Sequence, residues 1–219
     1  MNPTPTAAIV ESLKKAIVDH RLEPGEKLVE QRLADTYGVS RTLVRQALYQ
    51  LEKLRLIRLE PARGAFVAEP SVQEAKQVFA VRRILENDLI RQMVAQANSK
   101  HLRALETHLV METAAIKQND IAHRTELLGD FHVVMAKQLD NEVLAQMLSD
   151  LISRCALITM MYQSAQDARN SNAEHAAIVE AIRERDTERA LSLMNTHLDH
   201  VEASLAFPAS PKNKQKQAA

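Results

Sequence analysis

Polar residues at the start of one expected helix carry the clearest chemistry in this chain. Arg41 and Arg45 offer forked guanidinium donors that suit guanine edges or phosphates. Thr42 lies between them, and Ser40 is a good helix N-cap, because its hydroxyl can accept a hydrogen bond from a free amide of the first turn. A recognition helix presents such groups near its N-terminus to the major groove. The stretch 38–48 therefore predicts a helix that reads duplex DNA.

The opposite face of this helix must pack against other elements to hold the helix in place. Apolar residues recur in it at helical spacing, at Val44, Ala47, Leu48 and Leu51. Gly38 can take the positive φ that a turn between two helices often needs. The apolar spacing before that turn predicts two more helices, near 6–19 and 30–37. Three helices complete a small core behind the polar face.

Two short extended runs follow the helices, at 56–59 and 65–68, and a turn with Arg63 and Gly64 separates them. They predict a β-hairpin with a basic tip, whose arginine can enter a minor groove or touch phosphate. A single helix with two arginines is usually just a solvated helix. The ordered set of three helices and a basic hairpin within residues 1–70 favours a winged helix-turn-helix instead.

The rest of the chain has a helical pattern almost throughout. Apolar spacing and polar joints predict helices near 72–97, 100–118, 120–139, 141–166, 171–185 and 187–205. Short joints imply antiparallel neighbours, so we expect an all-α bundle over 71–207 and a disordered tail over 208–219. The expected fold class is mostly α, with an N-terminal winged helix-turn-helix followed by an all-α antiparallel helical bundle.

Composition limits the possible partners and compartments. The 219 residues include 28 Lys and Arg and 28 Asp and Glu, so the net charge is zero and charge alone does not indicate nucleic acid. Cys155 is the only cysteine, which excludes an intramolecular disulfide. Because we find no signal-peptide pattern and no apolar run that approaches 18 residues, we expect a cytoplasmic protein with no membrane partner.

The N-terminal pattern resembles the GntR family of bacterial transcription regulators. The matching residues are Leu22, Pro24, Gly25, Leu28, Glu30, Leu33, Ala34, 38–42, Val44, Arg45, Ala47, Leu48, Leu51 and 63–67. The resemblance implies that Ser40, Arg41, Thr42 and Arg45 contact an operator and that Gly64 approaches the minor groove. The preceding helix of the family carries a DNA-contacting arginine where Gln31 stands here. Arg32 is next to it, so both residues are candidates for that contact.

One further departure from the GntR pattern concerns the end of the recognition helix. The family usually has glycine where Arg55 stands. A left-handed cap costs a non-glycine residue roughly 1 kcal/mol, so the local turn can differ here.

The helical part resembles the FCD ligand domain of the FadR subgroup. The match includes Val81, Arg82, Leu85, Glu86, Phe131, His132, Asn141, Glu174, His175, Ile178, Asp186, Met194 and His197. The resemblance implies that His132, His175 and His197 bind a divalent metal such as Zn²⁺ or Ni²⁺. Leu128 replaces the aspartate that usually accompanies them. We expect Asp130 to face away, because two residues turn a helix by about 200°.

Three outcomes remain open for these histidines. They form a three-ligand metal site, they bind an anionic effector directly, or they are hydrogen-bonded core residues. Arg82 matches an arginine near the pocket of similar domains, where its forked donors suit an effector carboxylate. An ion pair between Arg82 and Glu86, four residues on, is the alternative.

Together these features indicate a ligand-responsive transcription regulator and not an enzyme. We expect a homodimeric repressor that a small carboxylic or sugar acid releases from an inverted-repeat operator in double-stranded DNA. A metal-sensing regulator is the alternative. A metal-dependent hydrolase that uses the three histidines is a further one.

Overall fold

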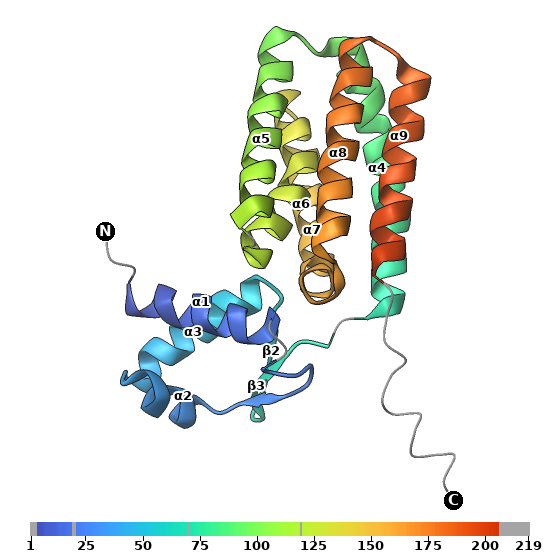
Figure 1. Cartoon of the computed structure of the whole chain (residues 1–219). Helices are drawn as coiled ribbons and strands as arrows, with labels where there is room; N and C mark the ends of the chain where they lie inside the picture. The colour runs from blue at the N-terminus through green and yellow to red at the C-terminus, as the bar shows by residue number, and fades with distance from the viewer. Residues whose placement is uncertain (1–3, 19–20, 70, 119, 206–219) are drawn as a thin grey trace, which may run out of the picture.

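The computed structural model describes residues 4–18, 21–69, 71–118 and 120–205, with a small N-terminal part next to a helical bundle (Figure 1). The N-terminal part contains α1 (Pro5–Val18), β1 (Lys27–Leu28), α2 (Glu30–Tyr37), α3 (Arg41–Lys53), β2 (Ile57–Glu60) and β3 (Gly64–Val67). These elements form the winged helix-turn-helix that the sequence predicts. The expected tail over 208–219 lies outside the described residues.

Local sequence explains where α3 begins and which side it buries. Gly38 ends α2 in the left-handed conformation, with φ of 62°. The Ser40 hydroxyl then caps α3 by accepting a hydrogen bond from the Leu43 amide at 3.4 Å. The four apolar residues of the predicted stripe are buried, at Val44, Ala47, Leu48 and Leu51. The polar N-terminal residues of the helix are thereby left on the outside.

The wing is a three-stranded antiparallel sheet in the order β1-β3-β2. The hairpin register pairs Ile57 with Val67 and Glu60 with Gly64. The strand β1 was not predicted, because two residues carry no readable alternation. Arg55 keeps the left-handed turn that family members make with glycine, with φ of 57°, at a cost of roughly 1 kcal/mol.

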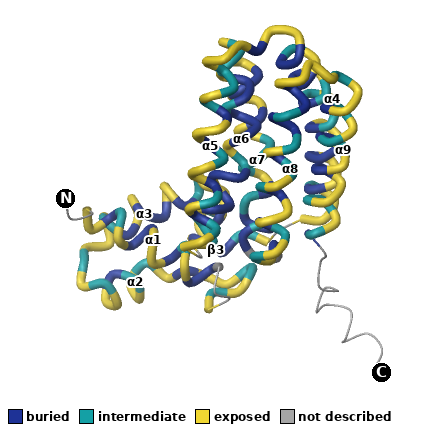
Figure 2. The backbone as a smooth tube through the Cα atoms, turned by 45° about the horizontal axis from the view of Figure 1, so that its top comes forward, coloured by how far each residue is buried: buried dark blue, intermediate teal, exposed yellow. Residues whose placement is uncertain are grey.

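The bundle contains α4 (Val72–Gln96), α5 (Ser99–Gln118), α6 (Ile121–Gln138), α7 (Glu142–Tyr162), α8 (Ala165–Arg183) and α9 (Thr187–Ser204). Consecutive helices run in opposite directions (Figure 1), and each turns a buried stripe toward the others (Figure 2). The fold class predicted from the sequence is therefore confirmed.

The joint between α7 and α8 differs from the prediction. We expected a break near 167–172, because polar residues gather there, but α8 already begins at Ala165. Ser164 and Asp167 form a capping box, in which each side chain bonds the backbone amide of the other. The polar residues that follow lie within the helix, among them Asn172, which bonds to α5.

Helix α7 belongs to two hydrophobic cores. Cys155 and Ile158 pack in the core of the bundle, whereas Leu157 and Met160 pack in the core of the N-terminal part. It is also the one described helix whose length and apolar composition, over Glu142–Met160, would suffice to span a membrane. Burial in the two cores accounts for part of that apolar character, since 39% of the span is buried.

Gly38 provides a test of the turn that positions α3. A Cβ at this position would meet no heavy atom within 4 Å, so the cost of Gly38→Ala is conformational. We expect it to lower the free energy of unfolding by about 1–2 kcal/mol, measured by chemical denaturation followed by circular dichroism. Gly38→Asn should lose less, because asparagine tolerates this conformation. Equal stability of the alanine variant would contradict the strained turn.

Candidate functional site

Both arginines predicted to read DNA point outward from α3. The side chains of Arg41 and Arg45 are 55% and 56% exposed. Glu30, at the start of α2, holds them together: Arg41 Nη2 lies 3.0 Å from Oε2 of Glu30, and Arg45 Nε lies 2.8 Å from Oε1. The hydrogen bond from Arg45 lowers the pKa of Glu30 despite partial burial. The two guanidinium groups therefore share one orienting carboxylate.

The other residues predicted on this face are also exposed. Thr42 and Arg32 are open to solvent, and Gln31 donates a hydrogen bond to Asp35 at 2.8 Å. Ser40 is exposed too, although its hydroxyl is engaged as the cap of α3. The helix-turn-helix thus brings all of the α2 and α3 candidates onto its exposed surface.

The wing gathers more positive charge than the sequence indicated. Arg63 is 70% exposed at the hairpin turn, and Gly64 has φ of 101°, which favours glycine. The charged groups of Arg63, Lys27 and Arg58 lie 5.3, 5.7 and 5.7 Å from the centroid of the Phe66 ring. Arg58 and Arg63 are also paired with Glu60, and Arg58 with Glu69, so Lys27 is the cation of the three for which no ion pair is found among the described residues. The exposed guanidinium of Arg63 can still reach a phosphate.

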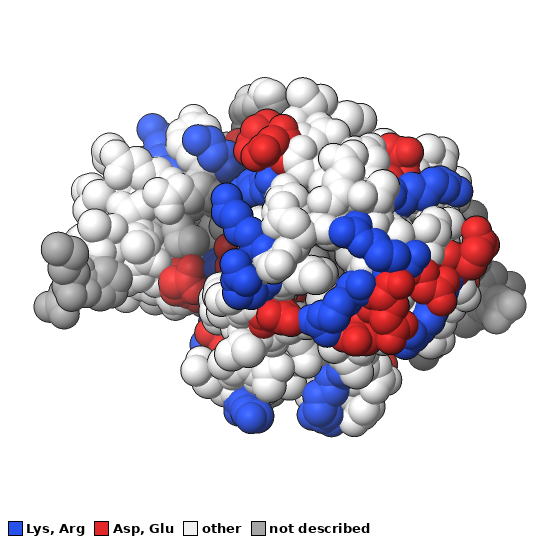
Figure 3. Space-filling model, turned by 90° about the horizontal axis from the view of Figure 1, so that it is seen from above, with Lys and Arg blue, Asp and Glu red and all other residues white. Residues whose placement is uncertain are grey.

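The surface at the top of the bundle has a different charge pattern. In the view from above, Lys and Arg side chains lie among Asp and Glu side chains (Figure 3). Mixed charges of this kind agree with the zero net charge and provide no electrostatic platform for DNA on that face.

The three predicted histidines converge inside the bundle. His132 on α6, His175 on α8 and His197 on α9 are buried, with exposed fractions of 1%, 0% and 2%. One nitrogen from each ring lies within 4.8 Å of the others, and Nε2 of His175 is 3.3 Å from Nε2 of His197. Phe131 stacks on the His175 ring at a centroid distance of 4.0 Å. The cluster can therefore hold a metal ion.

A glutamate carboxylate lies next to the Nδ1 atom of each of the three rings. Nδ1 of His175 lies 3.0 Å from Oε1 of Glu112, and Nδ1 of His197 lies 2.8 Å from Oε2 of Glu174. Nδ1 of His132 lies 2.6 Å from Oε2 of Glu86, although among the described residues neither atom has a hydrogen bond of ordinary geometry. Carboxylates in this position orient metal-binding imidazoles and increase their basicity.

The contact between His175 and His197 tests whether a metal fits. When both Nδ1 atoms donate to carboxylates, both Nε2 atoms carry lone pairs, and two lone pairs 3.3 Å apart repel each other. A cation between them removes the repulsion. Two nitrogens bound to one tetrahedral ion at 2.0–2.1 Å lie about 3.3–3.4 Å apart. The spacing of this pair therefore fits a tetrahedral ion such as Zn²⁺, and the ligand nitrogens of all three rings lie within 4.8 Å of one another.

Burial keeps the rings in the form that metals need. Desolvation lowers the pKa of His132 to about 3 and lowers the pKa of His175 well below its usual value. Burial alone would raise the pKa of Glu86, but the Arg82 guanidinium and His132 outweigh it and lower the pKa to about 2. Neutral imidazoles next to an ionised carboxylate are suited to bind a divalent cation.

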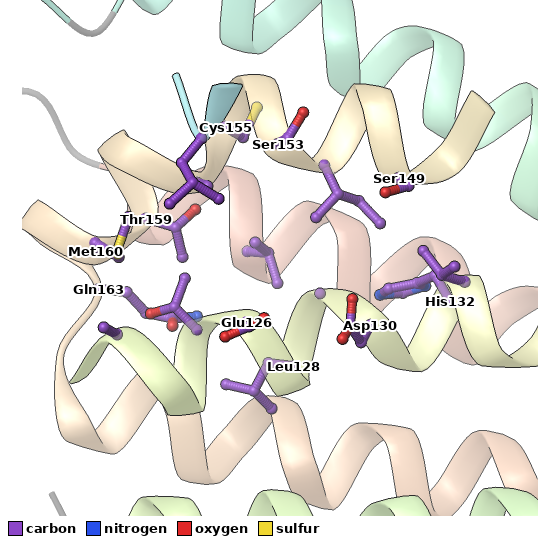
Figure 4. Close-up of a pocket in the computed structure, with 18 of the residues that line it drawn as sticks. Glu126, Leu128, Asp130, His132, Ser149, Ser153, Cys155, Thr159, Met160 and Gln163 are labelled. Carbon is purple, nitrogen blue, oxygen red and sulfur yellow. The ribbon is translucent and has the colours of Figure 1, made fainter. Parts of the chain in front are cut away.

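A cavity of about 380 Å³ opens beside the cluster, and both His132 and His197 line it. Figure 4 shows His132 at one end and Gln163 at the other. Leu128 lines this cavity, one turn before His132, at the position of the aspartate in similar domains. Asp130 also lines the cavity, but it is exposed and is not one of the clustered ligands, as expected for a residue that faces away from the histidines.

Arg82 forms the ion pair with Glu86 and also lines the cavity. Its Nε donates a hydrogen bond to Oε1 of Glu86 at 2.6 Å, and both side chains are buried, with exposed fractions of 5% and 0%. The ion pair that was the less favoured alternative is therefore present. Arg82 also lines the cavity, so the pair connects the cavity wall to the partner of His132.

The contacts of the glutamates with the histidines and with the arginines of α3 were not predicted from the sequence. Glu86 and Glu112 occupy buried stripes at helical spacing, between Arg82 and Leu89 on α4 and between His108 and Ala115 on α5. A charged residue inside an apolar stripe was therefore a readable indication of a buried partner. The contact of Glu30 with α3 depends on how two helices pack, and nothing in the sequence spacing reveals it.

The fold and the exposed arginines indicate a winged helix-turn-helix DNA-binding protein with a helical C-terminal domain. Residues 5–67 match the family described as bacterial regulatory proteins, gntR family, and residues 77–200 match the FCD domain. The chain belongs to the GntR family of DNA-binding transcription regulators, in the group that carries an FCD domain. This excludes the hydrolase alternative.

Known relatives span nearly the whole chain. The HTH-type transcriptional regulator YdhC of Bacillus subtilis is 27% identical over 205 residues, which are 90% of each chain. The HTH-type transcriptional repressor RspR of Escherichia coli is 24% identical over 208 residues, which are 94% of this chain and 91% of RspR. A putative GntR regulator from Rhodococcus shares the fold, with a TM-score of 0.70 at 23% identity, and the match covers 93% and 99% of the two chains.

Glu30→Gln tests how α3 is kept specific. In the native protein the Glu30 carboxylate orients Arg41 and Arg45 and partly neutralises their positive charge. The change removes this carboxylate. We expect tighter binding to any duplex but a ratio of operator to scrambled-duplex affinity that falls by about tenfold, which is the loss expected for one misread base pair. Fluorescence anisotropy at fixed salt measures both affinities.

Glu106→Gln provides the control for Glu30→Gln. It makes the same change in net charge, but on an exposed side chain of the bundle. If both variants shift the two affinities equally, the role of Glu30 is general charge and not orientation.

Proposed function

We propose that the protein is a cytoplasmic, homodimeric repressor, and that a small carboxylic or sugar acid releases it from an inverted-repeat operator. The main support is the buried histidine cluster, whose open side faces a cavity that Arg82 also lines. The forked donors of Arg82, together with a metal ion held by the imidazoles, would suit a carboxylate at this end of the cavity. RspR, a relative along almost the whole chain, is named a transcriptional repressor.

A divalent metal, Zn²⁺ or Ni²⁺, fits the proposed sensor. His132, His175 and His197 would hold it, and when bound it supplies a Lewis-acidic position for an effector carboxylate. With Leu128 in place of the usual aspartate, the protein supplies three direct ligands and leaves a position open toward the cavity. The glutamates behind the rings keep the imidazoles oriented.

A regulator that senses the metal itself remains the second candidate. The observation in its favour is the fit of the histidine spacing to an ion. Dialysis against a chelator, followed by operator binding with metal alone and with metal plus candidate acids, distinguishes the two. Release by metal alone identifies a metal sensor. Release only by acid supports the acid-responsive repressor.

The exposed apolar face of α4 and α7 is suited to a second copy of this chain. Val81 and Ile84 are 41% and 71% exposed on α4, and Val143 and Met147 are 73% and 46% exposed on α7. Arg154 pairs with Glu74 at 2.9 Å, and the two helices run antiparallel, so these four residues fall side by side. A two-fold dimer would bury this face and provide two DNA-binding domains for the two halves of an inverted repeat.

Arg45→Ala tests the repressor directly. Loss of its forked donors should lower operator affinity by about tenfold or more, and helicity and oligomeric state should be unchanged, because the side chain is exposed. Fluorescence anisotropy with a fragment selected from genomic DNA, together with sedimentation, measures both. Arg103→Ala, at an exposed position of the bundle, should retain affinity. Unchanged operator binding by the Arg45 variant would remove the basis for the recognition helix.

The metal site is tested by losing one ligand and by adding one. His175→Ala should abolish stoichiometric Zn²⁺ or Ni²⁺ in elemental analysis, whereas His123→Ala, at an exposed position of α6, should retain it. Leu128→Asp places a carboxylate one turn before His132. Loss of a residue that hydrogen-bonds to a metal ligand typically lowers metal affinity by roughly 10–100-fold. A fourth direct ligand should therefore increase the affinity by about tenfold or more.

The control for the added ligand is Leu128→Asn, which has the same shape without the charge. Competition with a chromophoric chelator measures the affinities of both variants. Metal content that survives His175→Ala would contradict the site.

A further inference from the structure

The cavity beside the histidines does not end within the bundle. Its lining includes Lys14 on α1, Lys53 at the end of α3, and Leu54 and Leu56 directly after it. All four belong to the winged helix-turn-helix. Because Leu157 and Met160 of α7 pack in the core of that domain, the two parts are in close contact here. The DNA-binding domain therefore forms part of the cavity wall.

The end of the cavity away from the histidines contains an unused polar group. Gln163 is only 7% exposed and lines the cavity, and its Oε1 has no hydrogen-bond partner among the described residues. A buried acceptor without a donor costs roughly 1–3 kcal/mol. Hydroxyl-bearing side chains surround the space between the two ends, at Thr125, Ser149, Ser153 and Thr159. Thr125 and Ser153 already donate to backbone carbonyls but can still accept hydrogen bonds, so the four side chains offer polar contacts to ligand hydroxyls within a lining that also contains apolar residues such as Leu128 and Ile152.

The charged residues that line the cavity indicate where the anionic groups of a ligand can bind. Glu126, Asp130 and Asp150 also line the cavity. Their carboxylates can accept hydrogen bonds from hydroxyls, but they disfavour an anion beside them. Cationic groups occur at the two ends. Arg82 lies near the histidines, and Lys14 and Lys53 lie at the domain junction.

The two lysines at the junction are not equivalent. Lys14 lies 3.2 Å from Glu11, and its side chain is only 16% exposed. Lys53 is exposed and has no side-chain partner among the described residues. It is therefore the cation at the junction that is available to a ligand.

We propose that the effector is a polyhydroxylated acid with an anionic group at each end. One end meets the histidine cluster and Arg82, the hydroxyl groups meet Gln163 and its neighbours, and the second anion meets Lys53 of the DNA-binding domain. A volume of about 380 Å³ has room for about a dozen waters at ~30 Å³ each, which suits a six-carbon chain of this type. This inference rests on the proposed acid-responsive function and specifies its ligand.

The second anionic contact gives the effector a direct route to the operator-binding surface. Lys53 is the last residue of α3, the helix that carries Arg41 and Arg45 at its other end. An effector that binds Lys53 more tightly in one arrangement of the domains shifts the protein toward that arrangement. An acid with a single anionic end would bind the bundle without that contact.

The experiment uses the full-length, metal-loaded protein and four six-carbon probes. Galactarate has hydroxyls and two carboxylates, 6-phosphogluconate has a phosphate at the second end, gluconate has one anionic end, and adipate has two carboxylates without hydroxyls. Calorimetry gives each Kd, and anisotropy gives operator release. We expect at least one hydroxylated probe with two anionic ends to bind about tenfold tighter than gluconate and to release the operator at lower concentration. The comparison of galactarate with 6-phosphogluconate identifies the second anion as carboxylate or phosphate.

Two variants assign the preference to residues. Lys53→Gln should raise the Kd of the preferred probe to that of gluconate, whereas Lys15→Gln, at an exposed position of α1 outside the cavity, should leave the preference intact. Gln163→Leu should weaken the hydroxylated probes and spare adipate.

The outcomes separate the two levels of the proposal. Equal affinity for gluconate and the probes with two anionic ends, or a preference that survives Lys53→Gln, overturns this inference and leaves the acid-responsive repressor standing. Adipate that equals galactarate overturns the polyhydroxylated ligand. If none of the four acids binds or releases the operator, both the inference and the proposed acid effector fail.

Discussion

The packing of α7 into two hydrophobic cores is the constraint on which the rest of the structure depends. Leu157 and Ile158 are neighbours in sequence, yet one lies in the core of the DNA-binding domain and the other in the core of the bundle. Packed cores tolerate little deformation. The DNA-binding domain therefore cannot change its position unless α7 moves with it or the contact between the domain and α7 breaks. Because Ser153 and Thr159 of the same helix line the cavity, whatever fills that space acts on the element that both domains share.

The histidine cluster depends on a second constraint, which is the burial of charge. Three glutamates stand behind the rings, and Glu86 is paired with Arg82 on its other side. An unpaired carboxylate in this interior would be strongly destabilising, whereas a paired one is tolerated. Glu86 has this cationic partner, whereas burial raises the pKa of Glu112 to about 7. The contacts of the carboxylates with the Nδ1 atoms also orient the imidazoles. This explains how the rings can converge although Leu128 removes one ligand, since their orientation comes from partners behind them and not from the missing aspartate.

The sequence predicted features that local chemistry determines and missed those that arise from packing. The Ser40 cap, the Gly38 turn and the apolar stripe of α3 each depend on residues a few positions apart, and all three are present. The break expected near 167–172 was wrong for the same kind of reason, because the capping box at Ser164 begins α8 earlier and was overlooked. The convergence of the three histidines came from family resemblance, since residues 65 positions apart cannot be placed by spacing. Glu30 beside Arg45, and Lys53 on the cavity wall, require knowledge of how separate helices and domains meet.

The geometry of α3 connects these observations. Arg41 and Lys53 are the first and last residues of one uninterrupted helix, which spans about 18 Å at a rise of about 1.5 Å per residue. One end presents guanidinium groups that Glu30 holds in register, and the other end borders the cavity. A continuous helix transmits a tilt at one end to the other with little loss, because its backbone hydrogen bonds resist bending. A displacement too small to disrupt either core is therefore sufficient to misalign the arginines with the base edges, whose recognition requires bidentate geometry. Sensing and reading can be coupled in this fold without any unfolding of the linker between the domains.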